Sequence, residues 1–340
     1  PVARGGRRGH GHGRRGRGGG AGHSKHTPAV AVLLTCMACM QGLLTTASKV
    51  NGGYEYRFGV VVFLAEGLKL LIAAQLLRGA RRRDPAGNPM TRDFKTMVMF
   101  PVPSVIYLVQ NNIQFVFLTY VDPTSYQILG NLKIVTTGLF FFFFLKREMT
   151  RLKWIALLLL LVGATTSQLN TCGGKVLNAP AMGYAMGVAS ACLSAFAAVY
   201  TEYIMKRNND CLHWQNAQLY FFGTVFNFLN LTAADLRQGF SDGFWLLDPF
   251  RGFSGVTWCV VANLALTGLV ISWIMKNADS IVKVYATSLS MFLTMLVSVW
   301  LFEFQPNLQL VLGITTACSS LQLYYMRPSD MFGRDAADKH

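Results

Sequence analysis

Apolar stretches of about twenty residues recur along most of the chain, and this repetition restricts the fold more than any other feature. A helix needs about 20 apolar residues to span the hydrocarbon core of a bilayer. The mean hydropathy is +0.35 and only 14% of the 340 residues are charged, which is too apolar for an ordinary soluble domain. We expect ten transmembrane helices, near 28–48, 57–77, 96–120, 123–145, 153–169, 180–205, 213–234, 255–275, 279–302 and 308–326.

These stretches predict an all-α integral membrane protein. Inside lipid every backbone polar group needs an internal partner, which leaves helices or a closed β-barrel. The run IALLLLLV at 155–162 lacks the alternation of a barrel strand. Short polar loops separate the stretches, so we expect one ten-helix domain over 28–326, followed by a cytosolic tail over 327–340.

The N-terminal segment accounts for much of the net charge of +15, since seven of the 31 basic residues lie in the first 26 positions. This Gly-, Arg- and His-rich composition predicts a disordered basic tail over 1–27. Contact with RNA or anionic lipid is the alternative to a solvated tail. No aromatic side chain is interleaved for a base to stack on, so we expect no nucleic-acid partner.

The basic residues also predict the orientation, because cytoplasmic loops are enriched in Lys and Arg. The two tails and the loops after the second, fourth, sixth and eighth helices hold 23 of the 31, whereas the opposite loops hold five. We therefore expect both termini in the cytosol and an even number of helices.

A weak internal repeat divides the domain into halves of about 28–169 and 180–326. Because five helices is an odd number, the second copy would be inverted relative to the first. Inverted repeats are typical of transporters, with the substrate near the membrane midplane at the interface of the repeats. The residues that match at one constant offset are Asp122 and Asp279, Leu132 and Leu289, and Thr137 and Thr294.

Three lysines, Lys69, Lys133 and Lys283, fall inside predicted helices. A cation at the centre of a membrane helix is unfavourable by about 2.5 to 3.5 kcal/mol or more, so such lysines indicate a pathway for an anion. Alternatively, Glu66 neutralises Lys69 at i, i+3, and carboxylates such as Asp279 pair with the other two lysines and only hold helices together.

Amide and tyrosine side chains share helix faces in three stretches. Amides both donate to and accept from a nucleobase edge, and tyrosines stack on it or hydrogen-bond with it. The alternative is that the amides only join neighbouring helices. The candidates are Tyr107, Gln110 and Asn111 in the third stretch, Tyr126 in the fourth, and Asn216 and Tyr220 in the seventh.

Five segments follow one another along the chain: YLVQNN at 107–112, YQ at 126–127 with LKI at 132–134, SAFAAVYTEYIMK at 194–206, NAQLY at 216–220 and KNADSIVKVYATSLS at 276–290. In this order they resemble the nucleotide-sugar transporter family of the drug/metabolite transporter superfamily, in the branch of the CMP-sialic acid and UDP-galactose transporters. The resemblance covers nearly everything from the first helix onward.

The resemblance implies a multi-pass Golgi antiporter with ten helices in two inverted halves. It would exchange a cytosolic nucleotide sugar for the lumenal nucleoside monophosphate, and Lys133 and Lys283 would hold the phosphate. We add Glu66 and Lys69 to the candidate site because both lie within a membrane helix. The residues that the resemblance places in the nucleotide pocket are Tyr107, Gln110, Asn111, Tyr126, Lys133, Asn216, Tyr220, Ser272 and Lys283.

Departures from the family pattern affect the expected specificity. Gly130 and Asn131 stand where relatives commonly carry Tyr and Gln, and Phe222 and Ile271 stand where hydroxyl-bearing residues are expected. We favour a CMP-sugar of the CMP-sialic acid type exchanged for CMP, with a UDP-galactose-type antiporter as the alternative.

Other function classes are less well supported. The chain lacks the hydrolase, metalloprotease, P-loop and dinucleotide motifs, and outside the tail its only histidines are His213 and His340. We therefore expect no enzyme, no cofactor and no metal. A proton-coupled exporter that uses Glu66 as the proton carrier and a receptor without transport remain open, as does the oligomeric state; lipid is an expected partner.

Overall fold

The computed structural model describes residues 26–50, 54–121, 123–169, 180–207, 209–241, 243–301 and 308–326. The predicted tails, 1–27 and 327–340, lie outside these ranges apart from His26 and Thr27. The described residues contain helices and connecting turns and no β-strand, which confirms the all-α fold class for this part of the chain.

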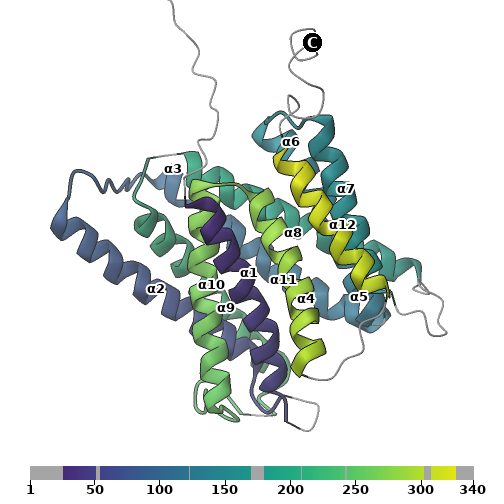
Figure 1. The fold of residues 1–340 in the computed structure, drawn as a ribbon. Coiled ribbons are helices and arrows are strands. Elements are labelled where there is room, and N and C mark those ends of the chain that lie inside the picture. Colours follow the sequence, from purple (N-terminus) through teal and green to yellow (C-terminus); the bar gives the residue numbers. More distant parts are fainter. Residues whose placement is uncertain are drawn as a thin grey trace, which may run out of the picture.

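The described residues form twelve helices (Figure 1). They are α1 (Thr27–Ala47), α2 (Phe58–Arg83), α3 (Phe94–Met97), α4 (Pro101–Tyr120), α5 (Pro123–Gly130), α6 (Lys133–Leu145), α7 (Arg151–Thr166), α8 (Ala181–Arg207), α9 (Leu212–Arg237), α10 (Gly255–Asn277), α11 (Ser280–Leu301) and α12 (Leu308–Tyr325).

Each of the ten predicted stretches is helical, but two of them are interrupted. The third begins as the short α3 and resumes as α4 at Pro101, because Pro101 and Pro103 have no N–H with which to continue the hydrogen-bond ladder. The fourth is divided into α5 and α6. There the Asn131 N–H is shared between the carbonyls of Gln127 and Ile128, and the Leu132 N–H bonds only three residues back, to Leu129 (all 3.1 Å), which tightens the turn.

Six spans within the described residues are long and apolar enough to cross a membrane by themselves. They comprise α1, α2, α5 with α6, α8, α10 and most of α11. Of the other long helices, α7 has 16 residues, and α4, α9 and α12 carry amides or hydroxyls within the span. The arrangement fits a multi-pass membrane protein.

The helices pack as neighbours in a repeating pattern. α7 packs against α12 and α2 against α9; α1 contacts α10 and α11, and α8 contacts α4 and α6. In Figure 1, α6, α7 and α12 gather at one side of the bundle, and α2, α9 and α10 lie at the other. At the α7–α12 contact, a Cβ on Gly163 or Gly313 would come within 2.8 Å of the other's carbonyl oxygen, so glycine permits this close approach.

Candidate functional site

A cavity of about 620 Å³ lies among α1, α4, α5, α6, α7, α8 and α11. Its lining combines amides, hydroxyls and one cation with a few apolar groups, which suits a polar ligand with negative charge. Of the predicted site residues, Gln110, Tyr126 and Lys133 line it. The other lining residues are Ala38, Phe117, Gln127, Gly130, Asn131, Gln168, Ser190, Ala191, Ser194, Ser290, Met291, Thr294 and Met295.

Lys133 is the first residue of α6, directly after the tightened turn, and its side chain faces this cavity. Lys283 is not among the lining residues, yet the two lysines lie close enough for their charges to repel each other. In the described part of the chain neither ammonium group forms an ion pair or a side-chain hydrogen bond. Two neighbouring cations without a counterion make a site for an anion.

Asp279, the alternative partner of these lysines, has a different role. Its Oδ1 accepts a hydrogen bond from the backbone N–H of Val282 at 2.9 Å and so caps the start of α11. Within the described residues it forms no ion pair with Lys133 or Lys283. The sequence alone left this pairing open, because Asp279 and Lys283 are four residues apart.

Lys69 and Glu66 form a second polar cluster, on α2. Lys69 Nζ is 2.5 Å from Glu66 Oε1 and lies 4.6 Å from the centre of the Tyr220 ring. The Tyr220 hydroxyl is 2.5 Å from Ser272 Oγ and donates to the carbonyl of Gly268 at 3.1 Å. The structure thus brings four predicted site residues together. It agrees with the alternative in which Glu66 neutralises the charge of Lys69. None of the four lines the cavity of Lys133.

Among the described residues, three buried amides have carbonyl oxygens without a hydrogen-bond partner: Gln110 Oε1, Asn216 Oδ1 and Gln218 Oε1. A buried polar atom without a partner is unfavourable by about 1 to 3 kcal/mol, so these atoms are candidates for contact with a ligand, and the first two belong to predicted site residues. Gln110 lies at the cavity and Asn216 in the first turns of α9. Tyr107 on α4 is 37% exposed and does not line the cavity. Asn111 also lies in α4, but its side chain is outside the described part.

Sequence reasoning missed several lining residues, among them Gln168, Ser190, Ser194 and Ser290. Hydroxyls in membrane helices commonly bond to their own backbone, as Ser290 Oγ does to the carbonyl of Thr287 at 2.8 Å, so their sequence carries little signal. Gln168 follows the end of α7, where a polar residue is expected in any case. Its Oε1 accepts a hydrogen bond from Asn131 Nδ2 at 3.3 Å.

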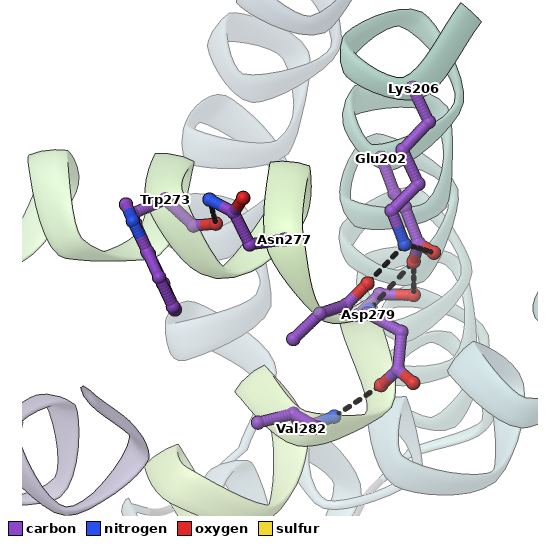
Figure 2. Close-up of polar contacts among 8 residues, drawn as sticks. Glu202, Lys206, Trp273, Asn277, Asp279 and Val282 are labelled. Carbon is purple, nitrogen blue, oxygen red and sulfur yellow. Dashed lines mark hydrogen bonds and ion pairs between the residues drawn. The ribbon is translucent and has the colours of Figure 1, made fainter. Parts of the chain in front are cut away.

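A charged cluster ties α8 to the turn between α10 and α11, as Figure 2 shows. The Glu202 side chain is fully buried, and its Oε2 accepts from the backbone N–H and the hydroxyl of Ser280, at 2.6 and 2.7 Å. Its Oε1 is 2.7 Å from Lys206 Nζ, which also donates to the carbonyl of Ala278. Both carboxylate oxygens are therefore partnered. We call Glu202, Lys206, Ala278 and Ser280 the ionic cluster.

Lys276 extends this connection to α9. Its Nζ donates to the carbonyl of Met205 at 2.7 Å and to Gln215 Oε1 at 3.0 Å. The sequence indicated only that Lys206 and Lys276 belong to positively charged loops. The ends of α8 and α10 and the start of α9 are thus joined by buried polar contacts.

The ionic cluster and the cavity lie at different levels of the bundle. Ser190 and Glu202 are twelve residues apart on α8, which corresponds to about 18 Å along a helix. Ser280 and Ser290 are ten residues apart on α11, or about 15 Å. One level therefore contains the charged contacts, and the other contains the cavity.

Proteins of known type resemble most of this chain. The family model for the nucleotide-sugar transporter matches residues 25–325. CMP-sialic acid transporter 1 of Arabidopsis thaliana is 52% identical over 304 residues, 88% of this chain and 89% of its own. CMP-sialic acid transporter 1 of Oryza sativa subsp. japonica is 51% identical, covering 87% of this chain and 93% of its own. The UDP-galactose translocator of Mus musculus is 37% identical, covering 77% and 69%.

A protein of known crystal structure aligns with 89% of this chain and 98% of its own length at a TM-score of 0.64. At 15% sequence identity this likeness concerns the fold alone. The family model and the relatives together span the helices that build the cavity, including the segments around Lys133 and Lys283. This chain belongs to the nucleotide-sugar transporter family.

Proposed function

We propose that this protein exchanges a CMP-sugar of the CMP-sialic acid type for CMP across the Golgi membrane. The observation that carries the proposal is the pair Lys133 and Lys283, which lie near each other beside the cavity and have no counterion among the described residues. A nucleotide phosphate supplies the missing negative charge. The relatives that are 51–52% identical are named CMP-sialic acid transporters, which favours a CMP-sugar.

A UDP-galactose-type antiporter is the second candidate, supported by the 37% identity to the mouse UDP-galactose translocator. The lower identity makes it the alternative rather than the first choice. A proton-coupled exporter that uses Glu66 is less well supported, because Glu66 already carries the counter-charge of Lys69 at 2.5 Å.

Exchange follows from the chemistry that the two ligands share. A CMP-sugar and CMP carry the same nucleotide, so the same amides, tyrosines and lysines would read both. A ligand shifts an alternating-access equilibrium only through different contacts in the two states, and the shared nucleotide provides these contacts for either ligand. The end of the bundle that the ionic cluster closes would then have to open, while the cavity end closes.

We also propose that the domain consists of two inverted repeats, about 28–169 and 180–326. The helix contacts support this: if every predicted helix is exchanged with the fifth one after it, the most extensive contacts map onto one another. The α1–α11 contact corresponds to α8–α6, the α4–α8 contact to α10–α1, and the α2–α10 contact to α9–α4. The α2–α9 and α7–α12 contacts map onto themselves. A twofold pseudo-axis through these two contacts accounts for the pattern.

In the proposed topology both termini lie in the cytosol, because Lys and Arg concentrate in alternate loops. The ionic cluster, which joins the end of the sixth predicted helix to the turn after the eighth, is then cytosolic. The cavity lies in the lumenal half of the bundle. With this topology, we propose that the described conformation is closed toward the cytosol.

Uptake of radiolabelled CMP into proteoliposomes preloaded with CMP, UMP or GMP, with and without a pH gradient, tests the function. We expect strong stimulation by internal CMP, a weaker effect of the other nucleotides, and no dependence on the gradient. Equal uptake into empty and CMP-loaded vesicles would refute exchange. Stimulation by UMP rather than CMP would favour the UDP-sugar alternative, and uptake driven by the pH gradient would favour the exporter.

A further inference from the structure

We propose that the wall formed by Gly130, Asn131 and Gln168 is the subsite for the sugar of the bound nucleotide sugar. This inference rests on the proposed function and assigns a part of the cavity that the nucleotide-reading residues leave unused. These three side-chain positions would decide how strongly the transporter prefers the nucleotide sugar over the free nucleotide, while the lysines would bind both.

The position of the wall relative to the lysines is the first reason. Gly130 precedes Lys133 by three residues, so about one helical turn separates them on the same face of the α5–α6 segment. All three wall residues and Lys133 line the same cavity. A ligand whose phosphate contacts Lys133 therefore extends its next group along this wall.

The nucleoside has a different place available. Asn216, Tyr220 and Ser272 belong to α9 and α10, and none of them lines the cavity. Asn216 Oδ1 is buried and has no hydrogen-bond partner within the described part of the chain, as expected of an atom that contacts a ligand. Because these groups lie on α9 and α10 and outside the cavity, the part of the cavity formed by α5 and the end of α7 remains for the sugar.

The chemistry of the lining also fits a sugar better than a base. Hydroxyl- and amide-bearing side chains are numerous there, whereas among the described residues Phe117 and Tyr126 are the aromatic members of the lining. The Phe117 and Tyr126 rings pack against each other at 4.9 Å between centroids. Sugar hydroxyls both donate and accept hydrogen bonds, so amides and hydroxyls are their natural partners.

The side chains of Asn131 and Gln168 are buried, with 8% and 7% exposure, but their hydrogen bonds within the protein are weak. Their mutual hydrogen bond is 3.3 Å long, beyond the usual range. The Gln168 amide nitrogen contacts the thioether sulfur of Met291, which is a weak acceptor. A sugar hydroxyl offers both amides a better partner than they have in the protein.

Gly130 supplies the space. An ideal Cβ built on Gly130 meets no atom within 4 Å, although the residue lines the cavity. By contrast, a Cβ on Gly187, a nearby glycine of α8, would come within 3.0 Å of Leu129 Cβ. Gly130 is thus not required for helix packing, and a larger side chain there would occupy the cavity itself.

The test compares the affinities of the purified full-length protein for CMP and CMP-sialic acid, measured by thermal-shift titration. For Gly130→Phe we expect the affinity for CMP-sialic acid to fall about tenfold or more, and the affinity for CMP to stay within about twofold. Gly130→Ala should leave both unchanged. Gly79→Phe is the matched control, since Gly79 on α2 is likewise open and lies outside the cavity.

Gln168→Leu provides an independent variant with no added bulk. It should lower the affinity for CMP-sialic acid several-fold, because about one hydrogen bond is lost, and leave the affinity for CMP unchanged. Equal losses for both ligands in both variants, or no loss for either ligand, would overturn the sugar subsite. A parent protein that binds neither ligand would instead overturn the proposed function. The two failures are therefore distinguishable.

Discussion

The bundle has two charged regions, which differ in whether the charged side chains have partners among the described residues. At the ionic cluster, Glu202 is fully buried and both of its carboxylate oxygens accept hydrogen bonds or a charge partner. Beside the cavity, Lys133 and Lys283 repel each other, and within the described residues neither has a protein partner. A buried charge that is paired fixes the relative position of helices, whereas a buried charge without a partner is available to bind a ligand of opposite charge.

Removal of the Glu202 carboxylate should have the largest effect on stability. Glu202→Ala leaves the Lys206 ammonium and the Ser280 donors without their acceptor, so we expect a loss of about 3 to 5 kcal/mol in unfolding free energy. Thermal unfolding in detergent measures it. Arg207→Ala, which removes an exposed contact with the Tyr203 hydroxyl on the same helix, is the control and should change stability by less than about 0.5 kcal/mol. Similar melting temperatures for the two variants would contradict the stabilising role of the ionic cluster.

Removal of Lys133 should give the reverse pattern. Lys133→Ala should lower the affinity for CMP at least about tenfold, or 1.5 to 3 kcal/mol, because a charge-assisted phosphate contact is lost. The melting temperature without ligand should be unchanged or higher, since the repulsion with Lys283 disappears. Thermal-shift titrations with CMP and cytidine separate the phosphate from the nucleoside.

If Lys133→Ala distinguishes CMP from cytidine as well as the parent protein does, Lys133 does not bind the phosphate. Lys283→Ala should behave like Lys133→Ala. Lys153→Ala serves as the control, because its Nζ lies over the Tyr324 ring, 5.5 Å from the centre, and Lys153 does not line the cavity.

Asn216→Ala should have a moderate effect that is specific to the nucleoside. We expect the CMP affinity to fall by one neutral hydrogen bond, about 0.5 to 1.5 kcal/mol, with a changed ratio of CMP to UMP affinity. Stability should change little, because Asn216 Oδ1 has no partner among the described residues. Asn227→Ala is the matched control, since Asn227 bonds to its own helix at Gly223. An unchanged CMP to UMP ratio in Asn216→Ala would argue against a contact with the nucleoside.

Deletion of residues 1–25 should have the smallest effect on binding. The segment is Gly-, Arg- and His-rich and is expected to contribute nothing to a pocket within the membrane. The truncated protein should bind CMP within about twofold of the parent in the same titration. A tenfold loss in a well-folded truncated protein would show that the tail takes part in the site.

Helix positions and the presence of charge in the membrane followed from the sequence, because both depend on local composition. About twenty apolar residues suffice to indicate a span, and Lys133 or Lys283 stands out in such a span whatever surrounds it. The interruption at residues 131–132 did not follow, because a tightened turn leaves the apolar pattern intact. Gln168 was missed because a polar residue at a helix end is unremarkable.

The sequence by itself determined a membrane-spanning helical protein with intramembrane cations, and its motifs indicated the family. Only the tertiary structure decided which of those charges are compensated. Lys69 and Glu66 are paired, Asp279 caps α11, and Glu202 serves as the acceptor for a turn about eighty positions further along the chain. These ion pairs and hydrogen bonds act over a few ångströms. The contacts between different helices therefore depend on how the helices pack, which the local sequence pattern does not encode.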